Sequence, residues 1–354
     1  MKKSYQGIEQ KRDSGDIWFN DLKRIRSQGP TLNNNRYENC KESTKAIHAG
    51  QYDDPTTGAI GTPIFQCSTF YLNESSYEAI GEGRGRDEMI YTRYGNPSQW
   101  SVQEKLSALE NAESSIVFSS GMAAYGGTYN FLYEDLDKYG MSVTFASPTD
   151  INAIEAAIQD NTKILYFEAL TNPLLKIAPI EAIVTLAKKY DLRVIIDNTF
   201  LTSYNLKTLD LGVDLVVNSA TKYLNGHSDL IGGTVSGSRK LIDRLWPQML
   251  KNGGSMDPHA CFLLERSLKT FALRMRTHNS NALQLATYLE NHQNIKKVYY
   301  PGLVSHYQHE LAKTQLKGKN SGMISFEIEG GDPNAHTLLK LLKLPKEATS
   351  LGGV

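Results

Sequence analysis

The sequence is poor in features that would point to a secreted or membrane protein. It contains only three cysteines, Cys40, Cys67 and Cys261. Three scattered thiols form neither a disulfide framework nor a metal-ligand pattern, which favours a reducing compartment. The sequence has no apolar run of about 18 residues, the length that a membrane-spanning helix needs. Polar residues, not an apolar signal core, follow the N-terminal methionine. We therefore expect a cytoplasmic protein with no membrane partner.

An excess of charge of either sign is also missing. The 38 Lys and Arg residues balance the 38 Asp and Glu residues, so the formal net charge is zero. Proteins that bind nucleic acids usually carry a basic surface, and we therefore expect no nucleic-acid partner. The 40% hydrophobic and 21% charged residues are typical of a soluble globular protein.

A dinucleotide-binding fingerprint is missing as well. The glycine-rich run at 81–86 comes nearest to one, but position 86 is Arg where G-x-G-x-x-G requires glycine. The run also follows no strand-like segment. A flexible loop explains it better, and this argues against a nicotinamide-dependent Rossmann enzyme.

Short apolar runs and amphipathic segments alternate from Thr44 onward. Strands rich in Val and Ile with helices between them predict an α/β fold, with a mostly parallel sheet covered on both faces. The expected strands are 115–118, 143–146, 164–167, 194–196, 215–217 and 233–236. The expected helices are 16–25, 100–111, 150–159, 180–190, 239–249 and a long one over 258–291.

Changes in the apolar pattern along the sequence also predict the domain organisation. Residues 1–43 are polar and form an N-terminal extension. Residues 44–290 form the α/β domain, including an N-terminal arm over 44–98. Residues 291–354 form a partial C-terminal α+β domain, predicted from the segments 297–300, 322–327 and 333–342.

Three predicted strand ends carry reactive or polar groups, and ligands of open parallel sheets bind beyond such ends. Lys222 follows strand 215–217, with the hydroxyls of Ser219 and Thr221 just before it. A desolvated lysine has a lowered amine pKa and can form a Schiff base with an aldehyde, while the hydroxyls can donate to a phosphate. Asp197 ends strand 194–196, where a carboxylate could face a pyridine nitrogen.

A third strand end supports the same interpretation. Gly121 and Met122 follow a Ser-Ser turn between a predicted strand and helix, where exposed backbone N–H groups form a phosphate cradle. Taken alone, Asp197 could be a helix N-cap and Lys222 a solvated surface lysine. The three strand ends together predict a site for pyridoxal 5'-phosphate (PLP).

The stretch SATKYLNGHSD at Ser219–Asp229 resembles the PLP-lysine signature of the Cys/Met metabolism family. This family includes cystathionine γ-synthases, cystathionine lyases, methionine γ-lyases and homoserine sulfhydrylases. The resemblance runs from about Thr44 to Val354. The further matching segments are His48–Gly50, Tyr91–Pro97, Ser119–Ala124, Tyr125–Tyr129, Phe167–Pro173, Asp197–Phe200, Leu268–Met275, Tyr299–Leu303 and Ser350–Val354.

The resemblance implies how the cofactor would be held. Lys222 would carry PLP as a Schiff base and move protons between substrate Cα and Cβ. Asp197 would pair with the pyridine nitrogen, and Tyr125 would stack on the ring and assist proton transfer. The residues implied to hold the phosphate within the subunit are Gly121, Met122, Ser219 and Thr221.

The resemblance also implies a fold, partners and a reaction. The fold would be that of the fold type I (aspartate aminotransferase-like) PLP enzymes. Tyr91 and Arg93 would reach the phosphate of a neighbouring subunit, so a homo-oligomer, a dimer or tetramer, is expected. Asn172 would lie near the ring oxygen and the substrate carboxylate, while Ser350 and Leu351 would line the substrate pocket.

The implied reaction is γ-elimination or γ-replacement on a small amino-acid substrate of trans-sulfuration. Cystathionine, methionine and an O-acylhomoserine are the candidate substrates, and a β-lyase fits the motifs less well. Thr349, where several cystathionine-handling members carry Glu, leaves the substrate open. No metal is expected, because His227 has no second ligand group at metal-binding spacing.

Two departures from the family pattern favour an alternative. Ala124 runs directly into Tyr125, where the family has the rest of a helix and a strand. The arginine that clamps the substrate carboxylate, expected beyond Val354, is absent from the sequence. An internal deletion and a C-terminal truncation would make the chain a catalytically impaired PLP-binding remnant, or a partner subunit of an intact copy.

Overall fold

The computed structural model describes residues 37, 39–52, 54, 57–72, 74–121, 126–345 and 347–353. The helix expected at 16–25 lies outside these residues, as do Met122 and Tyr125.

The centre of the fold is a five-stranded sheet in the order β1-β5-β4-β3-β2. Strands β2, β3 and β4 pair in parallel, while β5 runs antiparallel to both β4 and β1. The predicted mostly parallel sheet is therefore confirmed, with β5 as the one reversed strand of the five. The strands are β1 Ser114–Phe118, β2 Ile164–Glu168, β3 Arg193–Asp197, β4 Leu215–Ser219 and β5 Gly233–Gly237.

Both faces of this sheet are covered, as the alternation of buried residues along β4 shows. Val216 packs into a hydrophobic cluster with Ile183 and other residues of α9 (Ile180–Lys189). Its neighbour Val217 packs into another cluster with Ile242 and Met249 of α11 (Arg239–Asn252). The apolar runs that predicted the strands are therefore explained by burial on two sides.

The strand predicted at 143–146 is wrong. Residues 141–147 form neither helix nor strand, and the sheet ends at β2. Met141 and Phe145 are each half exposed. A strand exists only when a neighbouring strand takes up its backbone hydrogen bonds, and within the described residues this segment pairs with none.

The single long helix predicted over 258–291 is also wrong, because it is divided into α12 (Pro258–Leu268) and α13 (Phe271–Glu290). The carbonyl oxygen of Ser267 accepts from the Thr270 N–H at 3.2 Å, from Thr270 Oγ1 at 3.1 Å and from Arg274 Nη2 at 3.0 Å. These donors occupy an acceptor that a continuous helix would need for its i to i+4 ladder.

The remaining elements surround this core. In the N-terminal half they are α4 Glu42–His48, α5 Glu74–Gly81, a 3₁₀ turn Gly85–Asp87, α6 Pro97–Glu110, α7 Gly126–Asn130, a π turn Phe131–Asp135, a 3₁₀ turn Leu136–Tyr139 and α8 Ile151–Ala157. In the C-terminal half they are α10 Thr202–Asn205, a 3₁₀ turn Leu209–Leu211, a π turn Ala220–Leu224, β6 Ile295–Tyr299, α14 His309–Gln315, β7 Ser325–Ile328 and α15 Gly331–Leu341.

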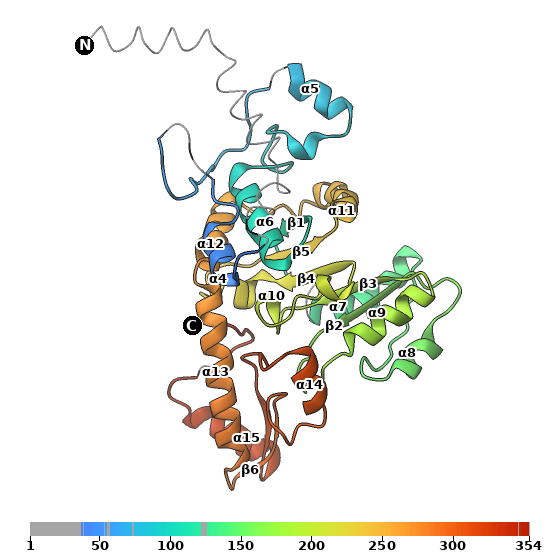
Figure 1. Cartoon of the computed structure of the whole chain (residues 1–354), viewed down its shortest axis with the longest axis vertical. Helices are drawn as coiled ribbons and strands as arrows, with labels where there is room; N and C mark the ends of the chain where they lie inside the picture. Colours follow the sequence, from blue (N-terminus) through green and yellow to red (C-terminus); the bar gives the residue numbers. More distant parts are fainter. Residues whose placement is uncertain are drawn as a thin grey trace, which may run out of the picture.

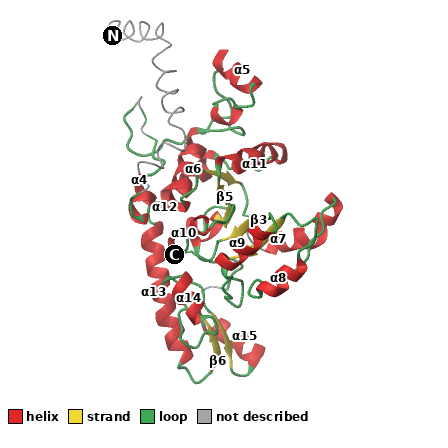
Figure 2. Cartoon of the chain, turned by 45° about the vertical axis from the view of Figure 1, so that its right-hand side comes forward, coloured by secondary structure: helices red, strands yellow, loops and turns green. Residues whose placement is uncertain are grey.

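Helix α13 leads from the sheet to a smaller α+β part of the chain (Figures 1 and 2). There β6 and β7 form an antiparallel pair, and a separate hydrophobic cluster joins Ala282 and Ala286 of α13 to Val298 of β6. After α15 the chain returns to the middle of the molecule, beside α13 (Figure 1). Among the described helices, none combines the length and apolar character needed to cross a bilayer.

Candidate active site

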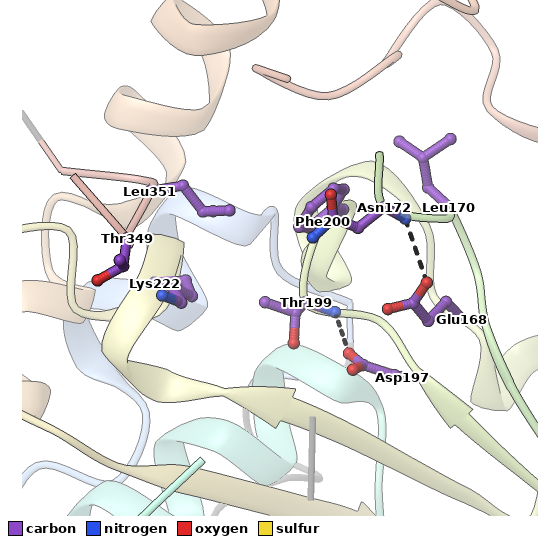
Figure 3. Close-up of a pocket in the computed structure, with 9 residues that line it drawn as sticks. All are labelled: Glu168, Leu170, Asn172, Asp197, Thr199, Phe200, Lys222, Thr349 and Leu351. Atoms are coloured by element: carbon purple, nitrogen blue, oxygen red, sulfur yellow. Dashed lines mark hydrogen bonds between the residues drawn. The ribbon is translucent and has the colours of Figure 1, made fainter. Parts of the chain in front are cut away.

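A pocket open to solvent lies at the carboxyl ends of β2, β3 and β4, and the space in and above it amounts to about 430 Å³ (Figure 3). This is where ligands of open α/β sheets bind. It is lined by Glu168, Leu170, Asn172, Asp197, Thr199, Phe200, Lys222, Thr349 and Leu351. Four of the residues predicted from sequence, Asn172, Asp197, Lys222 and Leu351, therefore meet in one cavity.

Asp197 is the last residue of β3 and is 4% exposed. Its Oδ1 accepts a hydrogen bond from the backbone N–H of Thr199 at 2.9 Å. Burial raises the pKa of its carboxyl group to about 8. A cationic group brought into the pocket would favour the ionised carboxylate again, as a protonated pyridine nitrogen would. The residue therefore fits the ring nitrogen of PLP.

Lys222 enters the pocket from the other side, on the π turn Ala220–Leu224 that follows β4. Its Nζ donates to Ser350 Oγ at 2.9 Å. Burial lowers the pKa of its amine below the ordinary value. A larger neutral fraction and a fixed position are what an amine needs to act as a nucleophile or base.

The predicted phosphate cradle is compact. A Cβ added to Gly121 would lie 2.5 Å from Ser219 Oγ and 2.9 Å from the carbonyl oxygen of Gly232, so only glycine fits there. Thr221 Oγ1 accepts from the Gly232 N–H at 3.0 Å. Gly121 and Thr221 thus lie against Gly232, with Ser219 beside Gly121, and small residues at strand ends suit a phosphate.

The C-terminal segment forms the third wall. Leu351 packs against two of the hydrophobic clusters, and Thr349 faces the pocket. Gly352 has φ +79°, and a Cβ there would lie 2.8 Å from the backbone nitrogen of Tyr223. The chain can approach the Lys222 turn this closely because residue 352 is glycine.

Tyr91 and Arg93 do not line the pocket of their own chain. Tyr91 is 43% exposed, and the Arg93 guanidinium lies 5.7 Å from the centroid of the Tyr91 ring. A hydrogen bond of 3.0 Å from Trp246 Nε1 of α11 to the carbonyl oxygen of Tyr94 fixes the adjoining backbone. Both side chains are therefore presented outward from an anchored segment.

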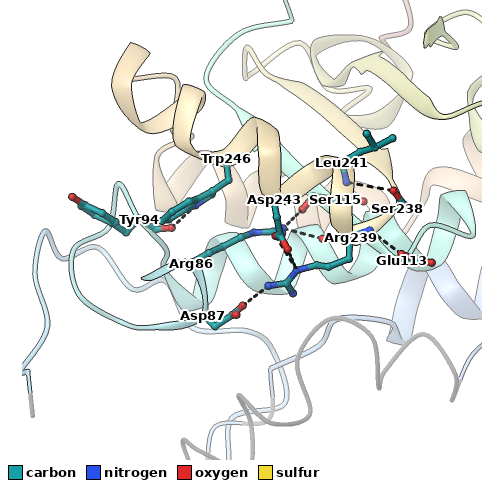
Figure 4. Close-up of polar contacts among 11 residues, drawn as sticks. Arg86, Asp87, Tyr94, Glu113, Ser115, Ser238, Arg239, Leu241, Asp243 and Trp246 are labelled. Atoms are coloured by element: carbon teal, nitrogen blue, oxygen red, sulfur yellow. Dashed lines mark hydrogen bonds and ion pairs between the residues drawn. The ribbon is translucent and has the colours of Figure 1, made fainter. Parts of the chain in front are cut away.

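The preceding turn, Gly85–Asp87, is anchored by the buried charge of Arg86 (Figure 4). Arg86 is 8% exposed and pairs with Asp243 of α11 at 2.5 Å, and it donates to Ser114 Oγ at 2.9 Å. Arg239 joins Asp243 to Asp87 at distances of 2.9 and 2.7 Å. The prediction of a flexible glycine-rich loop is thus wrong at Arg86, because its buried guanidinium ties the run to the sheet.

Sequence reasoning missed four lining residues, Glu168, Leu170, Thr199 and Phe200. Thr199 matters most, because its Oγ1 accepts from the Ser219 N–H at 2.8 Å while its own N–H binds Asp197. It therefore connects Asp197 to Ser219, two of the residues that the sequence predicts to bind the cofactor. All four lie inside the segments 167–173 and 197–200 that carry the family resemblance, and this was the available signal.

Glu168 is the register partner of Asp197 on the neighbouring strand. Its Oε2 accepts from the Asn172 N–H at 3.2 Å, and burial raises the pKa of its carboxyl group. It therefore fixes the loop that brings Asn172 to the pocket.

Histidine has a structural role at position 227. His227 Nδ1 lies 2.8 Å from the carbonyl oxygen of Asn225 and 3.1 Å from Ser267 Oγ. Over the described part of the chain, no group of three or more His, Cys, Asp or Glu side chains is arranged to hold a metal.

Comparisons with known proteins identify the family of the chain. The model of the Cys/Met metabolism PLP-dependent enzyme family matches residues 43–125 and 124–354. The two matches meet at Ala124 and Tyr125, where the sequence predicts an internal deletion.

Individual relatives are named for different reactions. A cystathionine gamma-lyase of Bacillus subtilis is 39% identical over 335 residues, covering 89% of this chain and 86% of the relative. A cystathionine beta-lyase of Coxiella burnetii is 39% identical over 350 residues, covering 92% of this chain and 87% of the relative.

A solved structure, metB from Corynebacterium glutamicum, superposes with a TM-score of 0.83 at 35% identity, covering 90% of this chain and 86% of that one. This likeness confirms the predicted fold type I α/β architecture. By their names, the two sequence relatives are both lyases that act on cystathionine. The chain therefore belongs to the family of PLP-dependent enzymes of Cys/Met metabolism.

Proposed function

We propose that this enzyme catalyses γ-elimination or γ-replacement on a sulfur amino acid or an O-acylhomoserine. The observation that carries the proposal is the pocket in which the Lys222 amine and the Asp197 carboxylate meet at the ends of two parallel strands. Relatives with both γ-lyase and β-lyase names leave the position of the cleaved bond to experiment.

PLP, when bound, accepts electron density from the substrate. Asp197 would hold the proton on the ring nitrogen, and Gly121, Ser219 and Thr221 would hold the phosphate. Lys222 would attach the cofactor and then, as a free amine, remove the proton from substrate Cα and move a proton at Cβ. Ser350 Oγ, 2.9 Å from the Lys222 Nζ, orients that amine for the transfer.

Substrate orientation would come from Asn172 and from the C-terminal wall. Asn172 would bind the substrate carboxylate, while Leu351 would exclude water from the reacting carbons. Met122 and Tyr125 lie outside the described residues, and we keep their roles in phosphate binding and ring stacking as proposals.

The outward position of Tyr91 and Arg93 supports a further part of the proposal. An exposed tyrosine and arginine on an anchored segment would serve the pocket of a neighbouring copy, so we propose a homodimer or homotetramer as the active unit. The alternative of an impaired remnant receives no support from the comparisons, in which the matched relatives are enzymes.

Product analysis tests the reaction. The chain loaded with PLP is expected to release ammonia and a 2-oxo acid from cystathionine or methionine, or to join a thiol to O-acylhomoserine. From cystathionine, γ-elimination leaves 2-oxobutyrate and cysteine, whereas β-elimination leaves pyruvate and homocysteine. Mass spectrometry of the products decides between them. A folded, PLP-loaded chain that transforms none of these substrates would contradict the proposal.

Removing the Ser350 hydroxyl is expected to lower kcat about fivefold with little change in KM. The reason is that one hydrogen bond to the Lys222 amine, of about 1 kcal/mol, is lost and the amine becomes less well placed. Steady-state kinetics of Ser350→Ala measure the effect. The matched variant Ser350→Thr keeps the hydroxyl and should stay close to the parent. Equal losses in both variants would show that the hydroxyl is not responsible.

A further inference from the structure

The backbone that carries Lys222 is not regular helix. Within the turn Ala220–Leu224, Lys222 has φ −89° and ψ −128°, which lies outside the helical region. Carbonyl groups at the end of such a turn need hydrogen-bond donors from elsewhere in the fold. The direction in which the Lys222 side chain leaves the backbone therefore depends on what holds this turn.

One side chain of α13 supplies the donors. Arg274 Nη1 donates to the carbonyl oxygen of Tyr223 at 2.6 Å, and Nη2 donates to that of Leu224 at 3.1 Å. Nη2 also donates to the Ser267 carbonyl oxygen at 3.0 Å, and Nε donates to Thr270 Oγ1 at 3.1 Å. The guanidinium thus joins this turn to the end of α12.

Arg274 is buried, and no carboxylate in the described part of the chain pairs with it. It is 8% exposed, and burial lowers the pKa of its guanidinium to about 10. Across the described residues it forms no ion pair with a carboxylate, so carbonyl dipoles and one hydroxyl take up its charge. Displacing the turn would leave a buried charge short of partners, which is costly.

Two neighbouring residues are fitted to this contact. Gly226 has φ +71°, and a Cβ there would overlap the Arg274 guanidinium, so the close approach requires glycine. Ser267 Oγ donates to the side-chain oxygen Oδ1 of Asn225 at 3.1 Å and makes a second link, from α12 to a residue three positions after Lys222. The turn is therefore held by side chains of both α12 and α13.

We propose that Arg274 is a positioning residue for Lys222. By holding the carbonyl groups of Tyr223 and Leu224, it fixes the turn from which the Lys222 amine reaches Ser350 and the pocket. The inference rests on the proposed function insofar as Lys222 attaches the cofactor. A merely structural arginine would change the stability of the fold and leave the state of the Lys222 amine as it is.

The test measures the Lys222 amine itself, in the full chain without PLP. Acetic anhydride in limiting amount acetylates neutral amines, and mass spectrometry reports the fraction of Lys222 modified as pH is varied. In Arg274→Gln the amine is expected to become better solvated, and labelling at pH 8 should fall about threefold, which corresponds to roughly half a pKa unit. Arg274→Lys keeps a donor and should recover part of the loss.

Two control variants separate position from stability. Arg276→Gln removes an exposed arginine of the same helix, and its Lys222 labelling should match the parent. Val298→Ala opens a cavity in the small cluster near β6 and lowers stability without touching the turn. A second test variant, Thr270→Val, removes one hydrogen-bond partner of Arg274 and should lower Lys222 labelling to a smaller extent. If Arg274→Gln does not fold, the labelling of Thr270→Val tests the role of Arg274.

Lower labelling in Arg274→Gln or Thr270→Val, with both controls unchanged, supports the inference. Labelling equal to that of the parent, or a loss as large in Val298→Ala, overturns it. PLP binding, followed by visible absorption, is recorded separately. A parent chain that binds no PLP would defeat the proposed function, while the labelling result would still decide the role of Arg274.

Discussion

Replacing Lys222 by alanine is expected to abolish the visible absorption band of the PLP-loaded chain and to lower turnover by about 10³-fold or more. The amine is both the point of covalent attachment and the carrier of the transferred proton, and a proton carrier alone contributes about 10² to 10⁴-fold. Of the described residues that line the pocket, Lys222 is the one with an amine. Absorption spectra and substrate assays of both chains measure the effect.

The attachment point can be read directly. Borohydride reduction of the PLP-loaded parent should fix the cofactor on the peptide that contains Lys222, as mass spectrometry will show. Lys240→Ala, which removes an exposed lysine of α11, serves as the matched control and should keep band, label and activity. An undiminished band in Lys222→Ala, or a label on another lysine of the parent, would refute the assignment.

Replacing Asp197 by asparagine is expected to lower kcat about 10² to 10⁴-fold while the chain still binds PLP. The substitution keeps the shape but removes the negative charge that would hold the ring nitrogen protonated, so the cofactor becomes a poor electron acceptor. Losses of this size accompany the removal of a single positioned charge from a catalytic group. Steady-state kinetics and the absorption spectrum at several pH values measure it.

Asp197→Asn is also expected to change how the stability of the PLP-free chain depends on pH. Burial raises the pKa of Asp197 to about 8, well above its value in an unfolded chain. The folded state then binds more protons than the unfolded state between about pH 4 and pH 8, so this carboxyl group makes the fold less stable as pH rises through that range. Asp197→Asn should remove this contribution to the fall in stability between pH 4 and pH 8.

Denaturant unfolding of the PLP-free chains at pH 4 and pH 8 tests the linkage. The free energy of unfolding of Asp197→Asn, relative to that of the parent, should be higher at pH 8 than at pH 4. The difference between Asp160→Asn, at an exposed position, and the parent should be the same at both pH values. A parent and an Asp197→Asn chain with parallel pH profiles would contradict the account.

The sheet and the chemistry of its strand ends were predictable from the sequence, because both depend on local pattern. Valine and isoleucine runs marked β3 and β4, and Asp197 and Lys222 come at or just beyond their ends. Successive residues of these runs are buried on opposite faces of the sheet, which explains why each run is apolar throughout. A residue at a strand end needs no long-range information to be placed at the ligand-binding edge.

Features that depend on distant neighbours were not predictable. Residues 143–146 have the composition of a strand, but pairing decides whether a strand forms, and pairing is absent from a local pattern. The break between α12 and α13 depends on Arg274 and Thr270 taking the Ser267 carbonyl group. Likewise, the contact of Lys222 with Ser350 joins residues 128 positions apart in the sequence.

That last contact has a consequence for how the site is assembled during synthesis. The strands, Asp197 and Lys222 emerge from the ribosome well before residues 349–351, so the sheet can fold while one wall of the pocket is still unmade. Contacts between such distant segments form slowly, because a long loop must first close. A nascent chain should therefore become able to retain its cofactor only after residues 349–351 have packed beside the Lys222 turn.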